Sequence, residues 1–166
     1  MVCILEQLKE VVDEFGMLTG DAVSDRIGVW GTNQPMEALA IVRPKNTDEV
    51  SSVLKLCNEQ SQPIVPQGGM TGLVKAGMPN SSEIAFSMER MNSIIDVDFD
   101  TATMTVEAGV TLQEAQEAAD AHGLMLPLDL GARGSATIGG NLSTNAGGNR
   151  VIRYGMTREM VLGVEA

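Results

Sequence analysis

The sequence predicts an α+β fold in which a β-α-β subdomain is followed by part of a second α/β subdomain. Three patterns indicate this class: short apolar runs typical of strands, amphipathic stretches that follow helix-start signals, and a change from β-α-β spacing to hairpin spacing after residue 92. Hydrophobic residues make up 43% of the 166-residue chain, which is a globular composition. The length corresponds to about one domain.

An N-terminal helical segment is predicted for residues 1–34. Apolar residues from Cys3 to Phe15 recur at helical spacing, and Gly16 follows them as a stop signal. The stretch from Thr19 to Pro35 is polar and shows no periodicity, so it receives no assignment. The first strand pattern therefore begins only after this segment.

A β-α-β pattern comes next. The apolar run Ala38–Val42 predicts one strand, and Ile64–Pro66 predicts another. Between them, Asn46 and Glu49 have the spacing of a capping box, which predicts the start of a helix. The buried face of this helix is expected to carry Val50, Val53, Leu54 and Cys57.

A third strand and a hairpin follow this pattern. Residues 83–87 form a further strand-like run. Ile94–Val97 and Met104–Ala108 flank a turn rich in Asp and Thr, which is typical of a hairpin. The spacing of the predicted elements thus changes from crossover to hairpin connections.

The remaining residues predict one more helix. Thr111 and Glu114 form a second capping box, and the helix that they open is expected to end near Ala121. The stretch 129–148 consists almost entirely of small and polar residues. Residues 161–166 are strand-like, and the chain is expected to be incomplete at its C-terminus.

The glycines that follow the strand predicted at Ile64–Pro66 are typical of an anion-binding loop. In the run QGGMTGL, Gly68, Gly69 and Gly72 lack a Cβ and can adopt positive φ, so that successive N–H groups converge on one phosphate. Gln67 and Thr71 add side-chain donors. Neutral donors suit this chain because 11 Lys and Arg stand against 22 Asp and Glu, a net charge of −11. A tight turn without a ligand explains this loop equally well.

A second segment of small and polar residues favours the ligand hypothesis. Residues 137–148 combine hydroxyls, amides and bare backbone, and such residues form helices and strands poorly. They suit the enclosure of a flat, polar ligand. The GxGxxG fingerprint and the GxxxxGK[ST] motif are both absent from the sequence, which argues against a Rossmann site and a P-loop.

Four motifs in this order resemble the FAD-binding (PCMH-type) domain of vanillyl-alcohol-oxidase-like flavoproteins, in the D-2-hydroxyglutarate and D-lactate dehydrogenase branch. They are PIVPQGGMTGL, SMERMNSIIDVD, TVEAGVTLQEA and LPLDLGARGSATIGGNLSTNAGGNRVIRYG. The resemblance covers residues 35–166 and implies two α/β subdomains, about 35–97 and part of a second at about 98–166, with FAD between them. It also implies that a cap domain with the substrate pocket lies outside this chain.

The resemblance implies a set of cofactor-binding residues. Those expected at the pyrophosphate are Pro66, Gln67, Gly68, Gly69, Met70, Thr71, Gly72 and Leu73. Those expected at the ribityl chain and flavin ring are Pro127, Leu128, Asp129, Ile138, Gly139, Gly140, Asn141, Ser143, Thr144, Asn145, Gly147, Gly148, Tyr154 and Gly155. Met70 replaces the family's usual Asn, and relatives with a covalent flavin carry His nearby, so non-covalent FAD is implied. No catalytic residue and no metal site are assigned.

The single histidine and four arginines near the second polar segment could have structural or functional roles. His122 ends the helix predicted from Thr111, where its imidazole is expected to meet the last carbonyls. Arg133, Arg150, Arg153 and Arg158 gather near the second polar segment. A cation there would stabilise an anionic reduced flavin, whereas solvated surface charges explain the same residues, and the sequence does not choose.

The predicted function is FAD-dependent oxidation of a small-molecule D-2-hydroxyacid by an oxidoreductase, with the chain alone inactive. The alternatives are another flavoenzyme of the superfamily, an oxidase or a reductase, and a non-catalytic nucleotide-binding module. The acidic charge and the lack of a long apolar stretch disfavour nucleic acid and a membrane span. Two cysteines and no leader pattern predict a reduced, cytoplasmic protein. Apolar surface at the C-terminal end is expected to favour a homo-oligomer or a partner.

Overall fold

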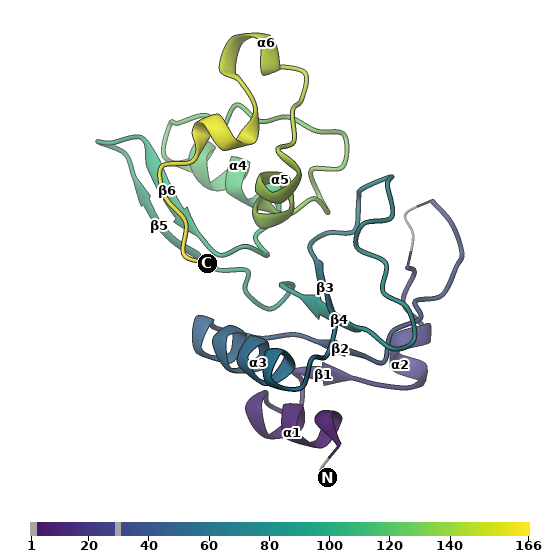
Figure 1. The fold of residues 1–166 in the computed structure, drawn as a ribbon. Coiled ribbons are helices and arrows are strands. Elements are labelled where there is room, and N and C mark those ends of the chain that lie inside the picture. Colours follow the sequence, from purple (N-terminus) through teal and green to yellow (C-terminus); the bar gives the residue numbers. More distant parts are fainter. Residues whose placement is uncertain (1–2, 29–30) are drawn as a thin grey trace. The chain divides into compact units, whose positions relative to one another are not determined.

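The computed structural model describes residues 3–28 and 31–166, and the chain forms two compact units, Met1–Met91 and Asn92–Ala166 (Figure 1). Each unit has its own buried residues. The domain boundaries expected from the sequence, at residues 34/35 and 97/98, remain predictions about the domain organisation.

A four-stranded sheet with the order β1-β2-β4-β3 is the centre of the first unit. The strands β2 (Ala40–Val42), β4 (Ile84–Ser87) and β3 (Ile64–Gln67) are parallel, and β1 (Met17–Leu18) pairs with β2 in the antiparallel direction. The three predicted strands are confirmed. The sequence did not show that β4 lies between β2 and β3, and β1 is too short for a visible alternation.

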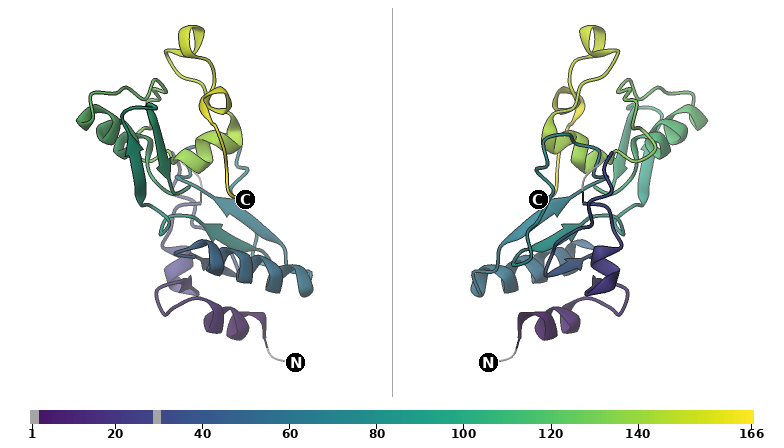
Figure 2. Two further views of the ribbon diagram at one scale, coloured as in Figure 1. Left: turned by 90° about the vertical axis from the view of Figure 1, so that its left-hand side faces the viewer. Right: turned by 90° about the vertical axis from the view of Figure 1, so that its right-hand side faces the viewer.

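Three helices accompany this sheet, and the strand residues divide between two cores. The helices are α1 (Ile4–Val11), α2 (Asp21–Ser24) and α3 (Thr47–Glu59). Helices α1 and α3 lie on the same side of the sheet (Figure 2). Alternate strand residues point to opposite faces. The core beneath α1 and α3 contains Leu8, Val12, Val42, Val53, Cys57, Ile84 and Phe86. The core on the other face contains Val23, Met36, Ile41 and Ala85.

Helix α1 is shorter than predicted. It ends at Val11 because Val12 is extended and the Asp13 carboxylate accepts a hydrogen bond from the Phe15 amide, which forms a turn. Val12 is nevertheless buried, whereas Phe15 is exposed. The apolar spacing therefore predicted the buried face correctly but not the end of the helix.

Helix α3 begins at the predicted Asn46 cap, but it differs from the prediction in the partner of Glu49 and in the exposure of Leu54. The Asn46 side chain accepts a hydrogen bond from the Glu49 amide at 2.8 Å, whereas the Glu49 carboxylate accepts one from the Lys45 amide at 3.0 Å. Val53 is buried as predicted, but Leu54 is 39% exposed, so its assignment to the buried face is wrong. Leu54 follows Val53 directly and so points about a quarter of a turn away.

The second unit combines an antiparallel hairpin with short helices. The hairpin consists of β5 (Ile94–Asp98) and β6 (Thr103–Val106), as predicted. The helices are α4 (Leu112–Ala121), α5 (Ile138–Thr144) and α6 (Val151–Tyr154), followed by the 3₁₀ helix η1 (Thr157–Met160). The buried apolar residues of this unit are Val110, Leu112, Ala115, Ala119, Leu128 and Ala136.

The predictions for α4 are confirmed at both ends. Thr111 and Glu114 form the complete capping box. At the other end, His122 Nδ1 lies 2.8 Å from the carbonyl oxygen of Ala118, so the imidazole meets a carbonyl of the last turn. The single histidine of the chain therefore has a structural partner.

Two segments differ from their prediction. Helix α5 forms within a stretch whose composition disfavours helices, and residues 161–166 form no strand. A strand requires a hydrogen-bonded neighbour, and no described strand pairs with residues 161–166. Among the helices of residues 3–28 and 31–166, none has the length and apolar character needed to cross a membrane.

Candidate functional site

The loop after β3 presents backbone amides that have no partner in the described part of the protein. Among the residues that the structure describes, the amides of residues 69–74 donate no hydrogen bond. Thr71 is half-buried, and its hydroxyl likewise has no partner in the described part of the chain. Consecutive free N–H groups on a loop after a strand are a chemical match for a phosphate anion.

Gln67 holds this loop closed. Its side chain is buried, and Nε2 donates a hydrogen bond to the Gly77 carbonyl at 2.8 Å and lies 3.7 Å from Met36 Sδ. A Cβ on Gly77 would lie 2.8 Å from Met70 Sδ, so a glycine permits this closure. The amide that the sequence offered as an anion donor thus has a partner within the loop.

Met70, rather than a glycine, adopts the left-handed conformation in this loop. Its φ is +53°, whereas Gly68, Gly69 and Gly72 do not have positive φ, so that part of the prediction is wrong. An unbranched non-glycine residue in this region costs roughly 1–2 kcal/mol. Asn, which the resemblance places here, tolerates the conformation better than Met.

Two arginines of the first unit, Arg26 and Arg43, are paired with one carboxylate. Arg26 and Arg43 contact the Glu89 carboxylate at 2.5 and 2.8 Å. Burial raises the pKa of Glu89, but the hydrogen bonds from Arg26 and then Arg43 outweigh it, so the pKa is lowered. The Arg43 Nε is buried and has no hydrogen-bond partner within residues 3–28 and 31–166. These arginines are therefore not free for a ligand's phosphate.

A second ion-pair cluster ties the end of α1 to the rest of the first unit. Arg90 contacts Asp13 at 2.8 Å, and Lys45 contacts it at 3.0 Å. The hydrogen bonds from Arg90 and then Lys45 hold the pKa of Asp13 far below its usual value. Arg90 and Lys45 are therefore engaged with Asp13, and the loop after β3 offers an anion its amides and the charge of the exposed Lys75.

The glycines at the start of α5 have their amides satisfied inside the protein. The Gly139 amide donates to the Ala108 carbonyl at 2.9 Å, and the Gly140 amide donates to Thr137 Oγ1 at 3.2 Å. A Cβ on Gly139 would lie 2.7 Å from the Cβ of Ala108. Gly139 is therefore required for close packing against residue 108.

The hydroxyls of α5 bond to their own helix. Ser143 Oγ donates to the Gly139 carbonyl at 2.8 Å, and Thr144 Oγ1 donates to the Gly140 carbonyl at 3.0 Å. These bonds give the hydroxyls a partner four residues back along the helix. Ser143 and Thr144, which the resemblance places at the flavin, therefore also have partners within their own helix.

The C-terminal end of α5 is capped by residues of η1. Asn145 is left-handed with φ +51°, and its side-chain oxygen accepts the Arg158 amide at 3.1 Å. The Arg158 guanidinium donates to the carbonyls of Leu142 and Ser143 at 3.0 and 2.7 Å. A cation on the last carbonyls stabilises a helix. One of the four gathered arginines thus has a structural role.

Gly148 lies directly on the backbone of Asp129. A Cβ there would lie 1.9 Å from the Asp129 carbonyl oxygen, and the Asn149 amide donates to that oxygen at 3.3 Å. Similarly, a Cβ on Gly147 would lie 2.6 Å from Met156 Sδ. The structure therefore brings the predicted residues near 129 and 148 together.

Asn141 is the predicted binding residue with an unsatisfied buried donor. It is 5% exposed, and its Nδ2 has no hydrogen-bond partner among the described residues. A buried donor without a partner costs about 1–3 kcal/mol. A hydrogen-bond acceptor on a ligand would remove that cost.

The other predicted residues of the second unit lie before and after α5 along the chain. Leu128 is buried, and its carbonyl accepts a hydrogen bond from Gln116 Nε2 at 2.7 Å. The Arg153 guanidinium lies 5.2 Å from the centre of the half-buried Tyr154 ring. Gly155 has φ +80°, which favours glycine. No group of three or more His, Cys, Asp or Glu is placed to hold a metal among the described residues.

The profile of the "FAD binding domain" family matches residues 38–166. The chain belongs to this family. The fold agrees, because a solved structure of alkyldihydroxyacetonephosphate synthase superposes with a TM-score of 0.83 at 22% identity, covering 96% of this chain and 31% of that one. The predicted family and the PCMH-type fold class are therefore confirmed.

Curated relatives have oxidoreductase names. The chain is 43% identical over 136 residues to D-2-hydroxyglutarate dehydrogenase of Xanthomonas citri pv. viticola, covering 82% of this chain and 29% of that protein. It is 47% identical over 123 residues to the mitochondrial D-2-hydroxyglutarate dehydrogenase of Arabidopsis thaliana, covering 74% and 22%. It is 34% identical over 163 residues to a D-lactate dehydrogenase of Anaerostipes hadrus, covering 95% and 33%. The chain thus spans at most a third of the length of these relatives.

Proposed function

We propose that this chain holds FAD without a covalent bond and binds its diphosphate on the amides of residues 69–74. The observation that carries the proposal is the row of amides after β3 that have no partner among the residues described by the structure. Neutral N–H dipoles stabilise an anion without a cation beside it. Membership of the FAD binding domain family supports the choice of cofactor. Met70, with a thioether in place of an imidazole, supports non-covalent binding.

The residues of the second unit would hold the ribityl chain and the isoalloxazine ring. The unpartnered Nδ2 of Asn141 supports this part, because a flavin carbonyl or ring nitrogen would accept its hydrogen bond. Gly139, Gly147 and Gly148 shape the segment by close packing. The bound flavin supplies the redox chemistry, accepting a hydride, and the protein orients the ring and tunes its electronics.

The substrate class that we propose is a D-2-hydroxyacid, oxidised by a dehydrogenase reaction. The names of the relatives at 43% and 47% identity support this class. The only histidine, His122, is engaged at the end of α4, so we place the group that takes the hydroxyl proton outside these residues. Purified chain loaded with FAD is therefore expected to leave D-2-hydroxyglutarate and D-lactate unoxidised in a dye-reduction assay, and turnover would contradict this placement.

Binding of the cofactor is tested by titrating the chain with FAD. Flavin fluorescence should change to saturation, and acid precipitation should release the flavin into the supernatant. Thr71→Val removes a hydroxyl from the loop at nearly constant volume and should weaken FAD about tenfold, the loss of one hydrogen bond. Thr19→Val is the matched control, because Thr19 is an exposed residue outside the loop. The proposal would be contradicted if the chain did not bind FAD, or if the flavin stayed covalently attached to the precipitated protein.

Location and association are further parts of the proposal. We propose a cytoplasmic protein, which cell fractionation tests, although relatives such as the Arabidopsis thaliana protein are named mitochondrial. We also propose that the exposed side chains of Leu162 and Val164 favour association with a second copy or a partner. Native mass spectrometry of the wild type and of a Leu162→Ser variant tests that association.

A further inference from the structure

Met70 packs between a core of the first unit and the far end of the loop after β3. Its half-buried side chain packs against the core that contains Val23, Met36, Ile41 and Ala85. Its Sδ and Cε lie against Gly77, where an added Cβ would come to 2.8 and 3.2 Å from these two atoms. The side chain therefore joins residue 70 both to the sheet and to residue 77.

The far end of the loop is held by further contacts. Gln67 Nε2 donates a hydrogen bond to the Gly77 carbonyl at 2.8 Å, and the Met78 amide donates to the Lys75 carbonyl at 3.1 Å. Residues 72–76, in contrast, are exposed. The loop is thus fixed at residue 70 and again at residues 75–78, and most of the unpartnered amides of residues 69–74 lie between these two points.

The backbone of Met70 needs its side chain to keep its conformation. Its φ of +53° lies in the left-handed region, which is unfavourable for a residue with a Cβ. Among the described residues, the Met70 amide donates no hydrogen bond that would offset this cost. Packing of the thioether side chain is therefore the interaction that stabilises the left-handed conformation.

We propose that Met70 is a positioning residue: by packing on Gly77 and on the core, it holds the free amides of the loop in the arrangement that binds a diphosphate. This inference rests on the proposed function, because it concerns the same loop. A loop that is ordered before binding loses less conformational freedom when the ligand binds, so the affinity is higher. Met70 would thus act through the backbone, without touching the cofactor.

Met70→Ala, followed by ¹⁵N relaxation of the free chain and by titration with ADP, tests this role. Order parameters of residues 69–71 should be about 0.85 in wild type and below about 0.6 in the variant. ADP should bind the variant about tenfold more weakly, because the loop must then be ordered on binding. A residue that contributes only to stability would lower the free energy of unfolding and leave the ADP affinity of the folded chain unchanged.

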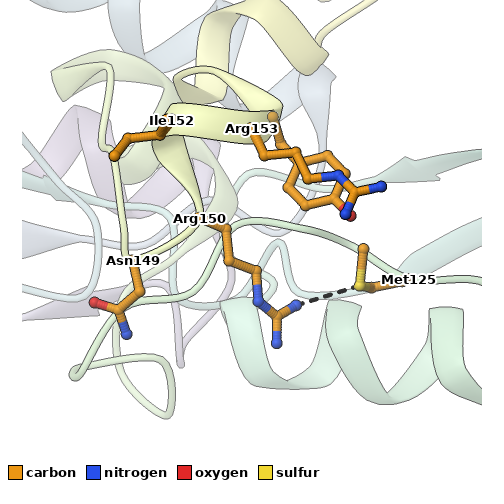
Figure 3. Close-up of a pocket in the computed structure, with 6 residues that line it drawn as sticks. Met125, Asn149, Arg150, Ile152 and Arg153 are labelled. Carbon is orange, nitrogen blue, oxygen red and sulfur yellow. Dashed lines mark hydrogen bonds between the residues drawn. The ribbon is translucent and has the colours of Figure 1, made fainter.

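Met125→Ala is the matched control. Met125 is a 50% exposed methionine of the second unit, and Arg150 Nη1 lies 3.3 Å from its Sδ (Figure 3). Its substitution should change neither the order parameters of residues 69–71 nor the affinity for ADP. An equal loss of ADP affinity in both variants would contradict a specific role of Met70.

Gly77→Ala tests the same contact from its other side. Beyond the two Met70 atoms, the nearest atom to the added Cβ is the Pro66 carbonyl oxygen at 3.9 Å, and Gly77 does not have positive φ. The substitution should therefore displace the Met70 side chain and weaken ADP, but it should add no further loss in the Met70→Ala background. Additive losses would contradict the coupling of the two residues.

Met70→Asn gives the result with the clearest sign. Asn adopts the left-handed conformation more readily than Met, but it is shorter and polar, so it loses the packing on Gly77. The variant should bind ADP and FAD more weakly than wild type. Tighter binding, or a wild-type affinity in Met70→Ala, would contradict this inference alone. A wild-type chain that binds neither ADP nor FAD would contradict the proposed function and this inference with it.

Discussion

The two glycine-rich segments of this chain have similar compositions, but their backbone amides differ in whether they have hydrogen-bond partners. After β3, the amides of residues 69–74 have no partner in the described chain. Around α5, the amides of Gly139 and Gly140 are bonded within the protein, and Gly148 has no space for a Cβ beside Asp129. Glycine richness therefore predicts an unusual backbone but not whether that backbone serves close packing or ligand binding.

The largest effect expected from this contrast is on stability at Gly148. Gly148→Ala would force a Cβ to within 1.9 Å of the Asp129 carbonyl oxygen, and backbone cannot move aside cheaply, so unfolding free energy should fall by about 3 kcal/mol. Gly72→Ala is the matched control, since nothing lies within 4 Å of its Cβ position, and it should change stability by less than about 1 kcal/mol. Urea denaturation measures both. Equal effects of the two substitutions would remove the distinction between the segments.

The next effect concerns the charges that stabilise the first unit. Glu89→Gln removes the partner of Arg26 and Arg43 and should cost about 1–2 kcal/mol at neutral pH, a value that allows for partial exposure. Glu14→Gln, at an exposed residue of the same unit, is the control.

The same pair of variants has a definite pH dependence. The folded pKa of Glu89 is lowered, so its stabilisation is complete above the usual value of 4.5 and is lost as the pH falls below it. Glu89→Gln should therefore flatten the decline in stability between about pH 5 and pH 3, whereas Glu14→Gln should keep it. An unchanged slope in Glu89→Gln would show that this carboxylate is not ion-paired.

These features also show how far the sequence predicts the molecule. Thr111 and Glu114 signalled α4 because a capping box is local, and apolar runs signalled β2, β3 and β4 for the same reason. The order of the strands and the helix α5 were not predictable, because they depend on contacts between distant residues. Such a contact joins Gly139 to Ala108.

The candidate site was predicted in part. The motif indicated the loop after β3 and the segment around α5, and the cofactor contacts of their residues remain predictions, whereas the bonds that their polar side chains make within the protein were not foreseen. Gln67 bonds to Gly77, ten residues away, and Asn145 forms the end of a helix.

A smaller effect is expected at the cap of α5. Arg158→Gln removes a cation that donates to the carbonyls of Leu142 and Ser143, so unfolding free energy should fall by about 1 kcal/mol. Arg158→Lys should recover part of the loss, because a lysine keeps the charge but not the fork of donors. Thermal denaturation of the two variants measures the difference. A stability equal to wild type in Arg158→Gln would mean that the carbonyls are satisfied by water.

The smallest effect is expected at Lys75, in the loop after β3. This exposed residue has φ +58°, and Asn tolerates that conformation better, so Lys75→Asn should gain about 0.5 kcal/mol. FAD affinity should change less than threefold, because the proposed contacts come from amides. A tenfold loss of FAD affinity would show that the lysine charge, rather than the backbone, holds the diphosphate.

The most direct test of the proposed cofactor site follows the backbone amides by ¹⁵N NMR as FAD is added. ADP, which carries a diphosphate without the flavin, is titrated in parallel. The resonances of residues 69–74 should shift with both ligands, and those of Asn141 should shift with FAD alone. Binding of FAD that leaves the amides of residues 69–74 unshifted would contradict the assignment of this loop to the diphosphate.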